Sequence, residues 1–506
     1  MLAWLHGLPL IVLIMGIGAA SMFVPAIHAS IVDDHFTARV FFYYAIFFLV
    51  LFAMIAFATS GRKIRRQARS HLIALLATFT VMPIMMAVPF QEAVRTTSYF
   101  NAWFEMVSSL TTTGATLFEP DRLPPTIHLW RALVGWMGGF FVWVTAIAIL
   151  APLNLGGFEV RGLGGEIGQA SSVGTPIARV ADPSERLSSF AAGFFPIYSV
   201  LTLVLWAVLF VLGDTPLVAL CHAMSTLATS GISPVGGPLG NGSGFLGEVV
   251  IFLFLMFALS RLTFAADERP EGLRSLADDS ELRLGLSIVA TVTVFLVLRH
   301  WLGAYEVETE SDGVAFLRTL WGAGFTVLSF LTTTGFESMG WEDARRWSGL
   351  STPGLILMGL AVFGGGVATT AGGVKLLRVF ALYKHGLREM EKLVHPNSVG
   401  GSGEVARQIR RQGAYMAWIF FMLFALSITV VMLAFAFTGL DFETSLVLTI
   451  ASLTTTGPLT AFAADTPIDL ATIGVEARTI FAAAMVVGRL ETLAIIALLN
   501  PDFWRS

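Results

Sequence analysis

Four segments of this 506-residue chain repeat one pattern, in which hydroxyl side chains run into a glycine. A dehydrated cation needs oxygen ligands on every side, and such a segment offers backbone carbonyls and uncharged hydroxyls that would not trap the ion. Glycine adds the backbone freedom that lets successive carbonyls face one axis. One such turn alone would more often be a polar cap or a helix-packing site. Four copies at similar spacing predict an ion filter instead, and they are Ser109–Gly114, Thr226–Gly231, Phe330–Gly335 and Ser452–Gly457.

The composition indicates the surroundings in which these turns must lie. The chain is 55% hydrophobic and 13% charged, whereas a soluble protein carries about 25% charged residues. A mean hydropathy of +0.75 therefore indicates a protein whose solvent is lipid. Apolar segments of spanning length predict about ten membrane crossings, at residues 5–30, 36–59, 71–90, 128–150, 189–212, 244–264, 283–303, 352–394 with an interruption, 413–438 and 475–499.

Charges in the connections orient these crossings. A basic cluster between Arg62 and Arg69 follows the second apolar segment, so the inward bias of Lys and Arg predicts that this loop and the amino terminus are cytoplasmic. The first apolar segment lacks a basic region ahead of it, which favours a retained helix over a cleaved signal. The four turns then fall in external connections, each after an apolar stretch that is expected to be too short to cross.

Backbone that enters and leaves a bilayer on one side is tolerated only where it lines a cavity. The expected fold class is therefore an all-α membrane protein. Four pseudo-symmetric repeats of helix, pore loop and helix surround one central pore, and two extra transmembrane helices precede them.

A glycine-rich run interrupts the eighth apolar segment just before Lys375. Glycine costs about 1 kcal/mol per helical position relative to alanine, so the run predicts an unwound segment beneath the filter that can block or release the pathway. A helix kink or close packing is the alternative. Arg489 falls within the last apolar segment, where a charge costs about 2.5–3.5 kcal/mol, and should face inward and donate hydrogen bonds to this run. The predicted gate residues are Gly364, Gly365, Gly366, Thr369, Thr370, Gly372, Gly373 and Arg489.

Other features argue against competing classes of protein. Walker A, paired-histidine and nucleophile-elbow motifs do not occur in the sequence, so we expect neither an enzyme nor a covalent or organic cofactor. A net charge of −4 gives no indication of nucleic acid binding, and the single Cys221 excludes an intramolecular disulfide. Glu105 and His222 are predicted to be hydrogen-bonded structural residues of the first two pore helices rather than ligands.

Several longer motifs resemble the TrkH/KtrB/HKT superfamily of potassium transporters, and within it the bacterial TrkH branch. They are Phe104-Glu105 ahead of the first turn, Gly135-Trp136-Met137-Gly138-Gly139, the glycine run ending at Lys375, Leu393-Val394-His395-Pro396 and Gly488-Arg489-Leu490-Glu491. The likeness covers nearly the whole chain. It implies two extra helices at residues 1–70 and pore repeats at 71–187, 188–280, 281–411 and 412–506, with the interrupted gating helix in the third repeat.

The resemblance also implies a site and partners. Potassium ions would bind in a filter made of Thr112, Thr113, Gly114, Thr229, Ser230, Gly231, Thr333, Thr334, Gly335, Thr455, Thr456 and Gly457. The protein would be a homodimer in membrane lipid, with one pore per subunit and a cytosolic nucleotide-binding subunit of the TrkA type docked on its inner face. The fourth loop, which is often rich in asparagine in the family, carries three threonines in this chain.

The expected function is gated potassium uptake through the bacterial inner membrane as part of a Trk system. One alternative is a sodium-selective or non-selective member of the superfamily, but such relatives usually carry serine where this chain has Gly114. A cation-coupled symporter is the second alternative, and it would use broken helices in inverted repeats. The four units here share one orientation, which favours a pore.

Overall fold

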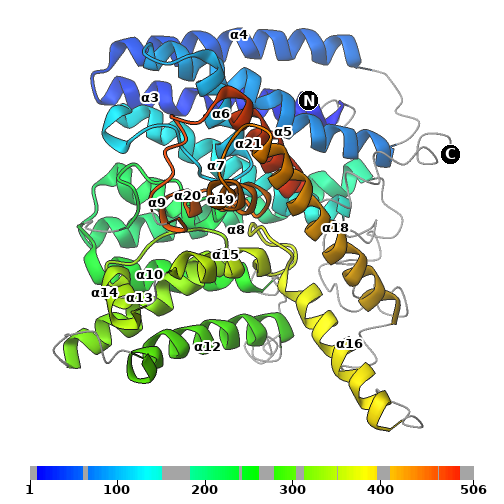
Figure 1. Cartoon of the computed structure of the whole chain (residues 1–506). Helices are drawn as coiled ribbons and strands as arrows, with labels where there is room; N and C mark the ends of the chain where they lie inside the picture. Colours follow the sequence, from blue (N-terminus) through cyan, green and yellow to red (C-terminus); the bar gives the residue numbers. More distant parts are fainter. Residues whose placement is uncertain are drawn as a thin grey trace.

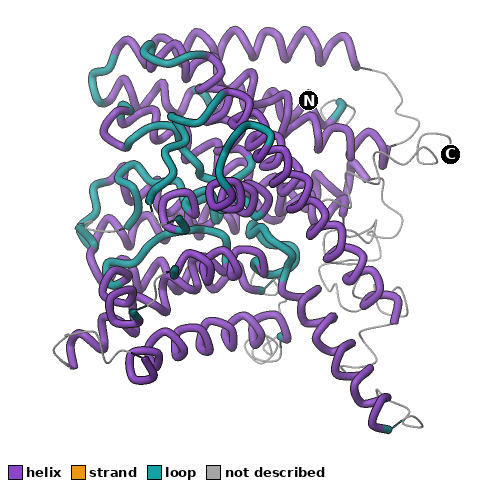
Figure 2. The backbone as a smooth tube through the Cα atoms, in the orientation of Figure 1, coloured by secondary structure: helices purple, strands orange, loops and turns teal. Residues whose placement is uncertain are grey.

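The computed structural model describes residues 8–60, 67–150, 183–238, 242–260, 279–303, 313–349, 352–395, 411–464 and 466–490. Within these ranges the chain forms helices and loops, without strands (Figures 1 and 2). Eight helices are long and apolar enough to cross a membrane. Many apolar side chains on their outer faces are exposed, such as Phe57 at 72% and Val430 at 57%, which is the surface that lipid would cover. The chain is therefore a multi-pass membrane protein.

Among the described residues, three helices precede the first repeat, and the first two of them together form one span, Leu10–Ile31. Each repeat then places a pore helix between two further helices. The amino-terminal helices are α2 (Leu10–Ser21), α3 (Phe23–Ile31) and α4 (His35–Thr59). The first repeat has α5 (Gln67–Val94), pore helix α6 (Tyr99–Leu110) and α7 (Pro125–Thr145), which continues into the π-helical turn η2 (Ala146–Leu150). The second repeat has α8 (Pro183–Val211), pore helix α9 (Pro216–Ala228) and α10 (Gly244–Leu255), followed by the 3-10 turn η5 (Met256–Leu259).

The third and fourth repeats follow the same plan with additions. The third has α12 (Ser280–Gly303), pore helix α13 (Gly313–Leu331), α14 (Trp341–Ser348), α15 (Pro353–Phe363) and α16 (Leu376–Val394). The fourth has α18 (Arg411–Ala436), pore helix α19 (Phe442–Leu453), the short α20 (Leu459–Phe462) and α21 (Val475–Leu490). Helices α16 and α18 contact each other and extend together away from the body of the molecule (Figure 1).

Local sequence explains where the pore helices begin. The Ser98 side chain accepts a hydrogen bond from the Asn101 N–H and caps α6. Asp441 caps α19 in the same way through the Thr444 N–H. Helix α9 starts with Pro216 at its first position, where the missing N–H of proline costs nothing.

One expectation about the pore helices is wrong. The apolar stretch before each turn was expected to be too short to cross a membrane, but α13 has 19 residues and meets the length and hydropathy of a span. Its carboxyl-terminal half is buried from Phe325 to Leu331, and it ends at the third turn. The added length is at its amino-terminal end, so α13 is still a pore helix by position.

Contacts between repeats close a ring. In each repeat, a helix that follows the pore helix contacts the pore helix of the next repeat. Helix α7 lies against α9, α10 against α13, α15 against α19, and α21 against α6. The loops between them run among the helices rather than around them (Figure 2). The four pore helices are thereby held around one centre.

Glycines allow the closest of the helix contacts. A Cβ on Gly138 of α7 would collide with the carbonyl group of Leu110 at the end of α6, and a Cβ on Gly488 of α21 would collide with that of Leu453 at the end of α19. The first and fourth repeats therefore use the same backbone contact between the pore helix and the helix that follows.

We expect Gly138→Ala to lower the melting temperature of the purified protein in detergent, because overpacking against backbone costs about 1–3 kcal/mol. Gly359→Ala in α15 is the matched control, since no atom lies within 4 Å of a Cβ at that position and alanine is the better helix former. A wild-type melting temperature for Gly138→Ala would show that this contact does not constrain the fold.

Candidate functional site

The four pore helices end in the same backbone motif. In the first repeat, Thr112 has a left-handed φ of 54°, and its N–H bonds the Ser109 carbonyl at 2.9 Å. The next N–H, from Thr113, bonds the Ser108 carbonyl at 2.9 Å. This pair of hydrogen bonds is the Schellman motif that often ends helices. The other three repeats repeat both bonds, with left-handed threonines at Thr229, Thr333 and Thr455.

Threonine is an unusual residue at this position, where glycine is the common choice. A left-handed residue with a Cβ costs about 1–2 kcal/mol, and such strain concentrates at functional sites. The motif turns two successive N–H groups back onto the helix. Among the described residues, no hydrogen bond uses the carbonyl oxygens of Thr112, Gly114, Ser230, Thr334 or Thr455, so these oxygens are available to a ligand.

The four loops touch in chain order and close a ring. A Cβ on Gly114 would collide with the Ser230 carbonyl, and one on Gly231 with the Thr334 carbonyl. A Cβ on Gly335 would lie 2.8 Å from the Pro458 side chain in the fourth loop. The structure thus places the filter residues expected from the sequence together around one centre.

The fourth loop closes the ring by a hydrogen bond and departs from the symmetry. Its Gly457 N–H donates to the Thr113 carbonyl of the first loop at 2.6 Å. Unlike the other three filter glycines, Gly457 does not have a positive φ. The N–H and hydroxyl of Thr460 both bond its carbonyl, at 3.0 and 2.9 Å. That carbonyl is therefore occupied. The carbonyls of Thr454 and Thr456 also accept hydrogen bonds within the loop, which leaves the Thr455 carbonyl.

The glycine-rich run interrupts the helix between α15 and α16, as the sequence predicts, and it lies against the ring of loops. The Thr370 hydroxyl donates to the Leu227 carbonyl at 3.1 Å and lies 3.2 Å from the Thr229 hydroxyl. The Gly372 N–H donates to the Thr333 hydroxyl at 2.7 Å.

Two of the four left-handed threonines therefore hold this run, whereas those of the first and fourth loops do not. The hydroxyls of Thr112 and Thr455 are buried and have no hydrogen-bond partner among the described residues. The run thus hydrogen-bonds only two of the four hydroxyls, although Gly372 lies close to the hydroxyl of Thr455.

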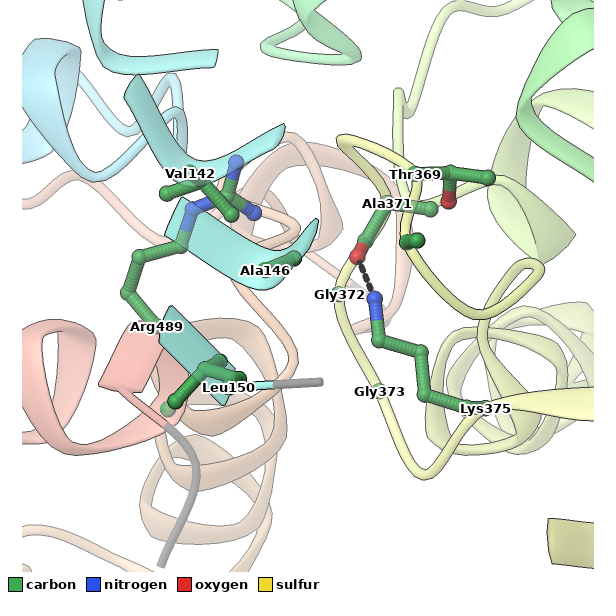
Figure 3. Close-up of a pocket in the computed structure, with 11 residues that line it drawn as sticks. Val142, Ala146, Leu150, Thr369, Ala371, Gly372, Gly373, Lys375 and Arg489 are labelled. Atoms are coloured by element: carbon green, nitrogen blue, oxygen red, sulfur yellow. Dashed lines mark hydrogen bonds between the residues drawn. The ribbon is translucent and has the colours of Figure 1, made fainter. Parts of the chain in front are cut away.

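Two cationic side chains fix the other side of the run. Arg489 of α21, which is 7% exposed, donates from Nη1 to the Thr370 carbonyl at 2.7 Å. The Lys375 amine donates to the Ala371 carbonyl. Figure 3 shows these cations on opposite sides of a cavity of about 30 Å³, which has room for one or two water molecules. The π-helical turn Ala146–Leu150 lines the same cavity, and π-helical turns are often found at functional sites.

The remaining predicted gate residues allow the run to approach the neighbouring backbone closely. Gly364 and Gly373 have positive φ values of 72° and 75°. They lie next to each other at the two ends of the run, so a Cβ on either would collide with the backbone of the other end. A Cβ on Gly365 or Gly366 would crowd the backbone of η5 and Ser260. The Thr369 hydroxyl bonds the Gly366 carbonyl within the loop.

Sequence reasoning missed three features of this site. It did not identify Lys375 as a hydrogen-bond donor to the run, although this residue directly follows the last glycine. It also missed the π-helical turn and the partner of Glu105, which is Arg131 of α7. Glu105 and His222 are buried and hydrogen-bonded to the segments beyond their loops, as expected for structural residues.

The chain is similar to several known proteins. The TrkH family model, described as a cation transport protein, matches residues 282–504. The Trk system potassium uptake protein TrkH of Salmonella typhimurium is 31% identical over 446 residues, 87% of each chain. That of Escherichia coli K12 is 30% identical over 494 residues, 96% of each chain. The crystal structure of the potassium transporter TrkH from Vibrio parahaemolyticus superposes with a TM-score of 0.80 at 27% identity, covering 99% of both chains.

We expect Thr333→Val to loosen the glycine-rich run, because it removes the acceptor of the Gly372 N–H. The measurement is the rate at which a thiol reagent modifies Ala371→Cys in a Cys221→Ala background, since residue 371 is only 1% exposed in the wild type. Thr112→Val is the matched control: it removes the equivalent hydroxyl of the first loop, which does not contact the run. Equal rates of modification in the two variants would show that the hydrogen bond from the Gly372 N–H to the Thr333 hydroxyl does not hold the run in place.

Proposed function

Because the chain belongs to the TrkH family of cation transport proteins, we propose that its ring of four loops is the selectivity filter through which potassium crosses the membrane. The protein is a potassium uptake transporter. The observation that carries the filter is the closed contact of the four loops, each ending its pore helix in the same left-handed turn. A dehydrated potassium ion in such a ring replaces its hydration water with carbonyl and hydroxyl oxygens.

Three residues of each loop make up the proposed filter. The first loop supplies Thr112, Thr113 and Gly114, and the second and third supply their counterparts from Thr229 to Gly231 and from Thr333 to Gly335. Uncharged oxygens suit conduction because they bind the ion without trapping it. In the fourth loop, the proposed ligand is the Thr455 carbonyl, because the Thr456 carbonyl accepts a hydrogen bond from the Leu459 N–H at 3.2 Å. Gly457 closes the ring through its N–H.

The run Gly364–Gly373 is the proposed gate. It bonds the filter threonines Thr229 and Thr333 on one side and Arg489 on the other. A loop in this place obstructs the path from the filter toward the cytosol, and two cations beside it oppose the passage of another cation. Opening requires that these hydrogen bonds break together.

The setting and partners follow from the Trk systems to which the relatives belong. We place the chain in the bacterial inner membrane with its amino terminus in the cytosol. It would form a homodimer that docks a TrkA-type nucleotide-binding subunit. The protruding helix α16 offers a basic surface for docking, formed by Lys384, Arg388 and Lys392. The basic loop between Arg62 and Arg69 supports this orientation through the positive-inside bias.

We expect Gly114→Ser to lower the ratio of potassium to sodium uptake into proteoliposomes. A side chain at this glycine would collide with the Ser230 carbonyl and displace oxygens that replace hydration water. Gly237→Ser is the control, since it also has a positive φ but has open space around it. An unchanged ratio in a folded, active Gly114→Ser variant would remove this loop from the filter.

We expect Arg489→Ala to raise potassium uptake in the absence of a cytosolic subunit, because the closed loop loses its bond from Nη1 to the Thr370 carbonyl. The preference for potassium over sodium should stay at the wild-type value, since the external filter is intact. Deleting the centre of the run should act in the same direction. Basal uptake at the wild-type level in both folded variants would show that the gate lies elsewhere.

A further inference from the structure

Behind each filter loop lies the same position of the pore helix, nine residues before the filter glycine. It is occupied by Glu105, His222, Thr326 and Leu448 in the four repeats, and each of these side chains is completely buried. We propose that the polar side chains at this position are positioning residues that hold the filter at the width that selects potassium. The proposal rests on the filter function proposed above for the four loops.

The first loop has the strongest support. Glu105 Oε1 accepts hydrogen bonds from the Leu117 N–H at 2.6 Å and from the Thr116 hydroxyl at 2.9 Å. Its Oε2 lies 2.9 Å from Nε of Arg131 on α7, and both side chains are at most 4% exposed. One carboxylate thus joins the pore helix, the segment just beyond Gly114 and the following helix.

Neutral contacts take the same place in the second and third repeats. His222 Nε2 lies 2.8 Å from the Ser233 hydroxyl, two residues beyond the filter glycine. The Thr326 hydroxyl accepts from the Ser338 N–H at 3.3 Å, three residues beyond the glycine. The same helix position therefore reaches the same part of the loop in three repeats whose side chains differ.

The fourth repeat shows why Leu448 needs no polar contact. Its loop turns at once into α20, and Thr460 of that helix bonds the Gly457 carbonyl twice. The other three loops instead continue as irregular segments directly beyond the glycine. A polar group on the pore helix is present in the three repeats that have such a segment and absent from the one that does not.

These contacts bear on selectivity because the filter must keep its carbonyls apart when a smaller ion enters. Groups that orient the ligands of an ion affect its binding by about 10–100-fold even though they do not touch it. Charge-assisted hydrogen bonds are about twice as strong as neutral ones. Among these pore-helix contacts, that of Glu105 should therefore matter most, through its charge and its pairing with Arg131. The third loop depends less on Thr326, because the Ser338 hydroxyl and the Met339 N–H also donate to the buried carboxylate of Glu248 on α10.

The test compares potassium and sodium uptake into proteoliposomes by purified variants. Glu105→Gln keeps an acceptor for the Leu117 N–H but leaves the Arg131 guanidinium facing an amide. It should lower the ratio of potassium to sodium uptake about tenfold. The double variant Glu105→Gln/Arg131→Gln restores a neutral hydrogen-bonded pair and should recover most of the ratio. Thr326→Val has nearly the same shape as the wild type and should fold even if the ion-pair variants do not. It should lower the ratio of potassium to sodium uptake less than Glu105→Gln does.

Leu448→Met is the matched control, because it changes the equivalent buried position of the fourth repeat without a polar contact and should keep the wild-type ratio. A wild-type ratio in Glu105→Gln, or in Thr326→Val should the ion-pair variants not fold, would overturn the proposal. So would a double variant no better than the single one, or an equal loss in Leu448→Met. Gly114→Ser in the same assay separates the two claims: if it too leaves the ratio unchanged, the filter assignment itself fails.

Discussion

The hydrogen bond that closes the end of each pore helix is the constraint on which the rest of the structure depends. In the first repeat it joins the Thr113 N–H to the Ser108 carbonyl, and it forces Thr112 into a left-handed conformation. This turn directs the chain across the helix end instead of onward into the membrane. Because all four pore helices end in this way, their loops meet and form a ring. The buried backbone of the ring then lines a pathway, which is the one place where a bilayer tolerates such backbone.

The proposed gate is held by the same turns. The hydroxyls of Thr229 and Thr333, which stand at the left-handed positions, also hold the glycine-rich run through Thr370 and Gly372. The same two threonine side chains therefore belong to the proposed filter and hold the proposed gate. Arg489 of α21 also holds this run through its hydrogen bond to the Thr370 carbonyl, which offsets part of the cost of a charge in an apolar helix.

The sequence predicted the ring because its pattern is local and repeated, and it predicted the glycine-rich run because glycine disfavours a helix there. It also located Arg489 through the cost of a buried charge. Local patterns do not specify contacts between distant segments, so the pairing of Glu105 with Arg131 was missed. The left-handed threonines were not predicted because glycine is the usual residue in that conformation. The hydrogen bonds to the Gly457 carbonyl were not predicted because they depend on the position of α20. The length of α13 was not predicted because its added residues lie ahead of its buried half.

The central claim is that the ring of four loops binds a dehydrated potassium ion. The most direct measurement is anomalous diffraction from crystals of the protein grown with thallium(I), which replaces potassium and scatters strongly. The account predicts an anomalous peak on the axis of the ring, within coordinating distance of oxygens from the loops of Gly114, Gly231 and Gly335 and from Thr455. Ordered crystals with no peak inside the ring, or with peaks only outside it, would contradict the account.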